Sequence, residues 1–161
     1  MRLTLMTDYA LRLLMYVAQR SERLCTIGEI ARAHDISEAH LMKVTHQLAQ
    51  QGWIVTVRGK GGGLRLAHAP ADIGLGKVVR SIEPDFDLVA CFANDSCGLS
   101  PGCRLTGVLQ GALQSFLGHL DRFTLADILP APEIVTPQTA TLAAHPIVET
   151  RPAGRRRVGP H

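Results

Sequence analysis

Residues 26–66 read TIGEIARAHDISEAHLMKVTHQLAQQGWIVTVRGKGGGLRL, and this stretch decides the fold. Thr26 and Glu29 have the spacing of a capping box, in which hydroxyl and carboxylate satisfy each other's backbone amides, so a helix begins there. Ser37 caps the next helix, which Gly52 ends. Two short helices joined by a tight turn predict a helix-turn-helix, although a pair of helices in a small bundle is the plainer alternative.

The segment that follows decides between the two. Residues 53–58 are β-branched and aromatic, residues 64–66 alternate as a returning strand, and the glycine-rich residues 59–63 form the turn between them. This turn matches neither the Walker phosphate loop nor the dinucleotide fingerprint, and no helix follows it. An ordinary glycine-rich turn is one alternative. A β-hairpin directly after a helix-turn-helix predicts a wing, and therefore a mainly α, winged helix-turn-helix fold.

Helical periodicity continues on both sides of this stretch. An apolar stripe predicts a first helix over residues 7–20, with Thr7 as its cap. A short helix is expected over residues 75–83, and a long one over residues 104–121, whose wide apolar face suits self-association. A last short helix opens at Thr124.

The predicted organisation has four parts. A DNA-binding domain is followed by a loop that binds a cluster, then by a dimerisation helix with a short C-terminal helix, and last by a disordered tail. Six of the nine prolines lie at or after Pro130, and the tail also holds a triple arginine. These parts cover residues 1–83, 84–104, 105–130 and 131–161.

Composition excludes several classes of protein. The chain of 161 residues is 46% hydrophobic, and it contains no apolar run long enough to cross a membrane. Aromatic residues make up 4%, too few for a platform that stacks single-stranded bases. Asp8 and Arg12 interrupt the first apolar residues, so we expect no export signal and a cytoplasmic protein. No nucleophile–base pair or pair of carboxylates is evident from spacing, so an enzyme is not predicted.

The net charge of +3 conceals a segregation along the chain. Residues 1–80 carry +5 and residues 81–130 carry −4. A basic N-terminal half is typical of proteins that bind the phosphate backbone, although a solvated charged surface is the simpler alternative. Together with the predicted wing, it indicates a double-stranded DNA operator as the partner.

Three cysteines share one long loop. Cys91, Cys97 and Cys103 are separated by five residues each, within residues 84–103. A loop of this length is usually functional or disordered. Cys25 stands alone near a helix start and is expected to be a small buried residue. The even spacing of the three thiols indicates a loop wrapped around a ligand.

Several ligands compete for this loop. Iron–sulfur clusters are held by thiolates, normally four, so three would leave one iron to an oxygen or nitrogen donor. Structural zinc favours closer cysteine spacing. Disulfides are disfavoured by the odd number of cysteines and the lack of an export signal, and a redox switch would leave the third thiol unexplained.

A family resemblance is carried by four features: MTDYALR at residues 6–12, the predicted helix-turn-helix, VRGKGGG at residues 57–63 and the three-cysteine loop. In this order they resemble the Rrf-two type of winged-helix transcription regulators, over residues 1 to about 130. Within that family, the pattern is most similar to the repressors that sense nitric oxide.

The resemblance implies a homodimer in which each subunit carries a 4Fe–4S cluster on Cys91, Cys97 and Cys103, with Asp8 of the partner subunit as fourth ligand. It further implies a repressor that loses operator affinity when nitric oxide attacks the cluster. Without the resemblance, Asp8 is a first-turn acid favoured by the helix dipole. A related branch has a histidine three residues after the third cysteine, where this chain has Thr106. The alternatives are a 2Fe–2S cluster, a related regulator of iron or cysteine status, and a winged-helix module stapled by zinc or a disulfide.

The DNA contacts are expected near the start of the third helix and in the wing. Ser37 and the helix N-terminus would hold a phosphate, and Arg58 would enter the minor groove. The full set of predicted contacts is Ser37, His40, Lys43 and Gln47 on the helix, with Arg58, Lys60 and Arg65 on the wing.

Overall fold

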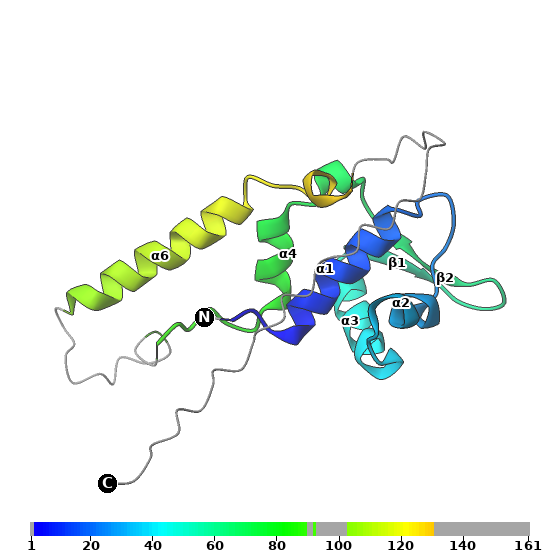
Figure 1. Cartoon of the computed structure of the whole chain (residues 1–161), viewed down its shortest axis with the longest axis horizontal. Helices are drawn as coiled ribbons and strands as arrows, with labels where there is room; N and C mark the ends of the chain where they lie inside the picture. Colours follow the sequence, from blue (N-terminus) through cyan, green and yellow to red (C-terminus); the bar gives the residue numbers. More distant parts are fainter. Residues whose placement is uncertain (1, 90–91, 93–102, 131–161) are drawn as a thin grey trace, which may run out of the picture. The chain divides into compact units, whose positions relative to one another are not determined.

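The computed structural model of the chain describes residues 2–89, 92 and 103–130. The predicted tail, Cys91 and Cys97 lie outside the described residues. The order of elements is that of a winged helix-turn-helix followed by two further helices (Figure 1). The predicted mainly α fold with a hairpin wing is therefore confirmed.

Helix α1 (Leu5–Ala18) begins earlier than the sequence predicts. Thr4, not Thr7, is its cap, because the Thr4 hydroxyl accepts the Thr7 amide at 3.4 Å. Thr7 lies inside the first turn and is fully buried. The prediction was wrong because two threonines with the same capping chemistry stand three residues apart, and burial selects between them.

The helix-turn-helix is confirmed at both predicted caps. Helix α2 (Ile27–His34) begins where the Thr26 hydroxyl accepts the Glu29 amide at 3.3 Å. Helix α3 (Glu38–Gln50) begins at Ser37, which caps the His40 amide. Between them Asp35 has φ = +52°, a left-handed conformation that an aspartate tolerates better than most residues and that turns the chain sharply.

The wing is an antiparallel hairpin of β1 (Ile54–Val57) and β2 (Gly63–Leu66). Its base is fixed to the rest of the domain because Cys25 and Leu64 exchange backbone hydrogen bonds of 2.8 and 2.9 Å. Cys25 is fully buried there, as the sequence predicts. The hairpin and the segment before α2 therefore form one unit.

Two glycines are required by close backbone contact. A Cβ at Gly62 would lie 2.3 Å from the Val57 carbonyl oxygen, and one at Gly63 would lie 2.6 Å from the Cys25 carbonyl oxygen. Real Cβ atoms do not approach backbone this closely. The turn is thus glycine-rich for steric reasons at these positions.

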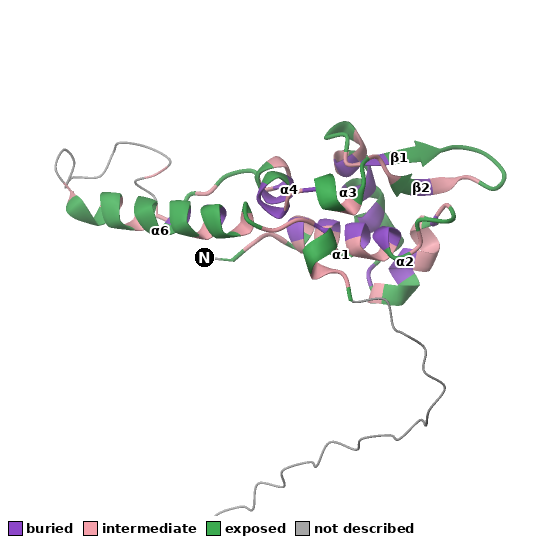
Figure 2. Cartoon of the chain, turned by 90° about the horizontal axis from the view of Figure 1, so that it is seen from above, coloured by how far each residue is buried: buried purple, intermediate pink, exposed green. Residues whose placement is uncertain are grey.

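After the wing, a 3-10 turn η1 (Pro70–Asp72) leads to α4 (Leu75–Ile82). Helix α6 (Arg104–Leu120) packs against α4 and is followed by η2 (Ala126–Ile128), a 3-10 turn where the sequence predicts a short helix. Arg80 and Asp121 join α4 to the end of α6 through paired hydrogen bonds. Along α6, only Leu113 and Leu117 are buried, and most of its surface is open (Figure 2). Every described helix is too short or too polar to cross a lipid bilayer.

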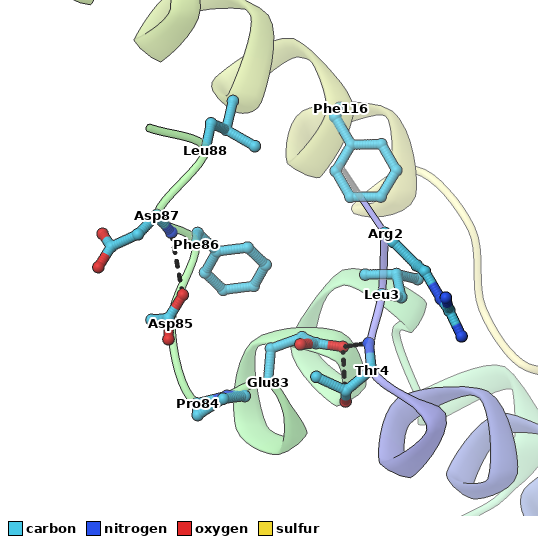
Figure 3. A pocket seen from close by; sticks show the side chains of 10 residues that line it. All are labelled: Arg2, Leu3, Thr4, Glu83, Pro84, Asp85, Phe86, Asp87, Leu88 and Phe116. Carbon is cyan, nitrogen blue, oxygen red and sulfur yellow. Dashed lines mark hydrogen bonds between the residues drawn. The ribbon is translucent and has the colours of Figure 1, made fainter. Parts of the chain in front are cut away.

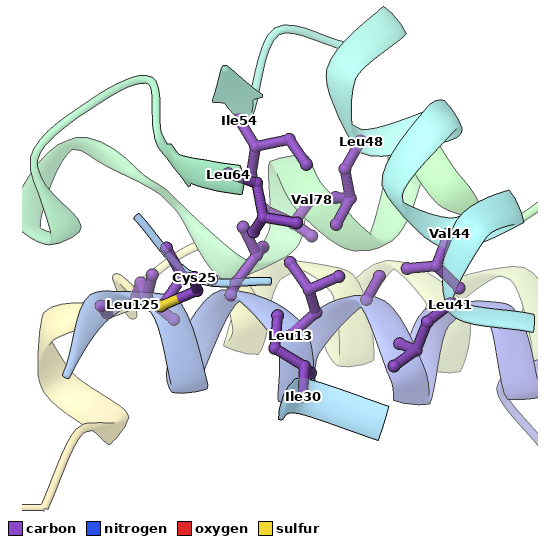
Figure 4. Packing of buried hydrophobic residues seen from close by; sticks show 14 of the residues in the cluster. Leu13, Cys25, Ile30, Leu41, Val44, Leu48, Ile54, Leu64, Val78 and Leu125 are labelled. Carbon is purple, nitrogen blue, oxygen red and sulfur yellow. The ribbon is translucent and has the colours of Figure 1, made fainter. Parts of the chain in front are cut away.

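The core surrounds α1. Leu13 and Leu14 are fully buried, and side chains from α2, α3, the wing and α4 pack around the same cluster (Figure 4). Burying an aliphatic side chain of this size contributes about 1.5–3 kcal/mol, so this helix supplies much of the folding energy. The core members shown from the other elements include Ile30, Leu41, Leu48, Ile54, Leu64 and Val78.

His34, at the end of α2, packs its ring edge-on to Tyr16 of α1, with ring centroids 5.7 Å apart. Its Nε2 atom is buried and, among the described residues, has no hydrogen-bond partner. Burial lowers the pKa of His34 from its usual 6.5, and the charges of Arg12 and Arg20 lower it further, against the opposing effect of Asp8. The fold therefore favours the neutral form of this imidazole.

We predict that acid destabilises the fold partly through His34. As the pH falls below about 6.5, the unfolded chain binds a proton at this residue before the folded chain does, so the free energy of unfolding decreases. His34→Gln removes this titration, and its melting temperature should fall less between about pH 7 and pH 5.5. His46→Gln, at an exposed histidine of α3, is the control and should track the wild type. Equal pH slopes for all three proteins would contradict the assignment.

Candidate functional site

The exposed face of α3 is mostly polar, with Lys43 as its cation, Glu38 as its acid and Met42 as its large apolar side chain. Its opposite face is buried, with Leu41, Val44 and Leu48 in the core, so the orientation of the helix is set by packing. The residues left on the surface include Ser37, Ala39, His40, Met42, Lys43 and His46. Met42 is 55% exposed. A helix held in this way presents a fixed row of side chains, as insertion into a major groove requires.

The predicted contacts at the start of α3 are held in place locally. The Ser37 hydroxyl lies 2.9 Å from Nδ1 of His40 and also caps its amide. The His40 ring lies beside Tyr9 of α1, with ring centroids 6.2 Å apart. The N-terminus of α3 and Ser37 together provide backbone and side-chain donors suited to an anion such as a phosphate.

Gln47 differs from the other predicted contacts on this helix. It is half-buried, and its side-chain amide donates to the Ile82 carbonyl oxygen at 3.2 Å. Ile82 ends α4, so this bond links two helices of the domain. Gln47 also lines an open concave surface at the end of α3, together with Met42, Lys43, His46, Gln50 and Gln51.

The wing carries the other predicted cations. Arg58 and Lys60 lie at its tip and are exposed. Arg65 is exposed on β2, where it pairs with Val55 of β1. The ion pairs of the described residues are Arg12–Asp8, Arg23–Glu29 and Arg80–Asp121, and none of them uses a cation of α3 or the wing. These positive charges are thus available to phosphates.

Cys103 is the cysteine of the loop that the structure describes. It is half-buried and immediately precedes α6. The amide and the hydroxyl of Thr106, with the amide of Leu105, lower the pKa of the Cys103 thiol. A thiolate at a helix N-terminus is the form that binds a metal or an iron–sulfur cluster, so the environment of Cys103 fits that ligand role.

Asp8 lies on the first turn of α1. Its two carboxylate oxygens accept hydrogen bonds from Nε of Arg12, at 3.0 and 2.9 Å. The side chain remains 43% exposed, so it can be reached from outside the subunit. Within the described residues, no three His, Cys, Asp or Glu side chains lie close enough to hold a metal ion. Cys91 and Cys97 fall outside that part of the chain, so the full predicted ligand set is not tested by this geometry.

A cavity of about 180 Å³ lies between the start of α1, the beginning of the cysteine loop and α6 (Figure 3). Residues 2–4, 83–88 and Phe116 line it. At its floor Glu83 accepts hydrogen bonds from the amide and the hydroxyl of Thr4, at 2.8 and 3.1 Å. The exit of α4 is thereby tied to the cap of α1.

Sequence reasoning missed three hydrogen bonds around the end of α4. They join Gln47 to Ile82, Trp53 to Ser81 and Thr4 to Glu83, over separations of 35, 28 and 79 residues. Local periodicity carries no signal for contacts at these distances. The sequence offers one indirect indication of these bonds: polar residues stand just before Pro84, at the end of a helix whose other face is apolar.

Comparison with known proteins agrees with this arrangement. Residues 3–131 match the family Rrf2, described as iron-dependent transcriptional regulators. The HTH-type transcriptional regulator NsrR of Bacillus subtilis is 48% identical over 132 residues, which cover 80% of this chain and 90% of that protein.

Solved structures show the same fold. The T. potens IscR structure has a TM-score of 0.64 and 26% identity, covering 80% of this chain and 85% of that one. The structure of CymR, the global cysteine regulator of B. subtilis, has a TM-score of 0.65 and 21% identity, covering 80% of this chain and 95% of that one. The helix-turn-helix, the wing and the match over residues 3–131 together lead to one conclusion: the chain belongs to the Rrf2 family of iron-dependent transcriptional regulators.

Proposed function

We propose that the protein is a cytoplasmic, homodimeric repressor that binds a DNA operator and senses nitric oxide through a 4Fe–4S cluster. The observation that carries this proposal is the combination of an exposed recognition helix and a cationic wing with 48% identity to the transcriptional regulator NsrR. The identity extends over 132 residues of this chain. The three-cysteine loop adds the ligand chemistry that such a cluster needs.

DNA binding is assigned to the surface formed by α3 and the wing. The proposed contacts are Ser37, His40, Lys43, Arg58, Lys60 and Arg65, all of them exposed. Lys43 and His40 would enter the major groove with α3, while the wing cations follow the phosphates and the adjacent minor groove. A DNA contact by Gln47 stays a prediction. Its side-chain amide already donates a hydrogen bond to α4, so Gln47 is left out of the proposed contacts.

The cluster is assigned to Cys91, Cys97 and Cys103, with Asp8 of the partner subunit as the fourth ligand. When bound, such a cluster supplies iron that reacts with nitric oxide. Cys103 supports the assignment through its lowered pKa, and Asp8 through its exposed carboxylate. A carboxylate is a hard donor that exchanges more readily than a thiolate, so the bond to Asp8 would be the weakest of the four. Asp8 must also give up part of its pairing with Arg12 to serve as a ligand.

The dimer is assigned to α6. Leu105 and Val108 are 61% and 68% exposed on this helix, which is unusual for large apolar side chains. A second copy of the chain would cover them. Dimerisation also gives two recognition helices, as a two-fold symmetric operator requires.

Anaerobic purification tests the central proposal. We expect a brown protein with about four irons and four sulfides per chain, whose affinity for operator DNA falls after exposure to nitric oxide. The measurements are iron and sulfide analysis, the visible spectrum and an operator titration before and after treatment. A colourless zinc protein, or an iron protein that binds its operator equally well after nitric oxide, would overturn it.

Asp8→Ala should leave a cluster that is lost more readily, because the oxygen ligand that completes the site is removed. The expected change is a loss of iron to a chelator about 10- to 100-fold faster than in the wild type, with the secondary structure unchanged. Asp72→Ala, at an exposed acid of η1, serves as the matched control. An Asp8 variant with the spectrum, the chelator resistance and the nitric oxide response of the wild type would remove Asp8 from the ligand set.

Lys43→Ala should weaken operator binding without affecting the cluster. Binding with one fewer cation in the interface releases about one fewer counterion, so the slope of log affinity against log salt should fall by about one. Lys77→Ala changes an exposed lysine of α4 outside the proposed interface and provides the control. The same salt slope in both variants would show that Lys43 does not contact the DNA.

A further inference from the structure

The last turn of α4 is a junction of three elements. The Ile82 carbonyl oxygen accepts the side-chain amide of Gln47 from α3 at 3.2 Å. One residue earlier, the Ser81 hydroxyl accepts the indole N–H of Trp53, which precedes β1, at 2.8 Å. One residue later, Glu83 accepts the amide of Thr4 at the start of α1. Three consecutive residues thus hold the recognition helix, the wing and the cap of α1.

The chain leaves this junction directly for the cysteine loop. Residues 84–89 follow Glu83 and lead toward Cys91, and residues 83–88 line the cavity of Figure 3. Ile82 is 3% exposed, so the turn is anchored in the core rather than free to drift. This turn is therefore the buried part of the domain that directly precedes the loop. The bond from Gln47 to Ile82 then joins the turn to α3 in one step.

Gln47 differs from the neighbouring glutamines because its side chain makes a tertiary hydrogen bond. Gln50 and Gln51 line the same concave surface, but both are exposed, and no side-chain hydrogen bond joins either to another described residue. The inner face of the helix is held separately from the Gln47 bond, because Leu41, Val44 and Leu48 are buried in the core. The bond is suited to adjusting the position of α3 rather than to holding it in the domain.

We propose that Gln47 is a positioning residue that couples the state of the cysteine loop to the recognition helix. With the cluster bound, the last turn of α4 would hold the Ile82 carbonyl where Gln47 can reach it, and α3 would take the orientation that fits the operator. Without the cluster, this constraint on α3 would weaken. The inference rests on the proposed function, since it requires the cluster-bound and cluster-free proteins to differ in operator affinity.

The test compares operator affinity in two forms of each protein. Wild type and Gln47→Met are prepared anaerobically with the cluster, and a portion of each is stripped with a chelator. Methionine has a similar length but cannot donate to Ile82. One hydrogen bond accounts for a factor of about two to ten in an equilibrium. We therefore expect the affinity of the cluster-bound variant to fall by about two- to tenfold, while the stripped variant matches the stripped wild type.

Gln50→Met is the matched control, because it makes the same chemical change on the same surface at a residue without a tertiary bond. For Gln50→Met, the ratio of the operator affinity of the cluster-bound protein to that of the stripped protein should equal the wild-type ratio. A contact between Gln50 and DNA would weaken both forms alike and leave the ratio unchanged. The ratio therefore separates coupling from contact.

Each other outcome overturns the inference in a recognisable way. An equal loss of affinity in both forms of Gln47→Met would make Gln47 a direct DNA contact. Unchanged affinity in both forms would mean that the bond to Ile82 has no role in binding. If wild type itself binds equally with and without the cluster, the proposed function fails, and the inference fails with it.

A second variant covers the case in which Gln47→Met does not fold. Trp53→Phe keeps an aromatic ring but removes the donor to Ser81, at the neighbouring residue of the same turn. It should also lower the ratio of cluster-bound to stripped affinity. A ratio equal to that of the wild type in this variant would overturn the role of the turn.

Discussion

Burial of α1 is the constraint on which the rest of the domain depends. Its inner face places Leu13 and Leu14, both fully buried, against side chains of α2, α3, the wing and α4. No other described element contacts so many of its neighbours. Because these contacts are close-packed, displacing α1 would disturb the recognition helix and the wing together. Because the packing around α1 fixes which faces of the helices are buried, it also fixes which charged side chains lie on the surface of the domain.

The proposed DNA-binding surface consists of the side chains of α3 and the wing that the core leaves exposed. With Leu41, Val44 and Leu48 turned inward, α3 presents the side chains of the opposite face to the solvent. The described cations that form ion pairs are Arg12, Arg23 and Arg80, outside α3 and the wing. Long-range attraction between the unpaired cations and a nucleic acid favours association, while the side chains on α3 decide which bases are preferred.

Local signals predicted the fold well where capping and periodicity act within a few residues. Thr26 and Ser37 were located from their own helices, and the hairpin from its β-branched strands and glycine turn. Thr7 was assigned wrongly because only burial distinguishes it from Thr4. The bonds of Gln47 and Glu83 were not foreseen, because a hydrogen bond across 35 or 79 residues leaves no periodic trace in the sequence.

For the candidate site, residue type identified the cations and the thiols, while geometry changed the interpretation of Gln47. The sequence analysis groups Gln47 with His40 and Lys43 as a DNA contact, but its side-chain amide donates to α4. Cys103 combines both kinds of information, since its place in a three-cysteine pattern comes from the sequence and its lowered pKa from the amides at the start of α6.

The steric fit of the wing turn has a consequence for mutagenesis. Gly62 and Gly63 abut the carbonyl oxygens of Val57 and Cys25, leaving no space for even a methyl group. Any replacement there must reshape the hairpin before it can alter a charge. Lost binding in such a variant would report a misshapen loop, whereas a change at Lys60 leaves the backbone alone and isolates electrostatics. Random substitutions in this turn should therefore fall into two classes: those at Gly62 and Gly63 that distort the hairpin, and those at Lys60 that remove a charge.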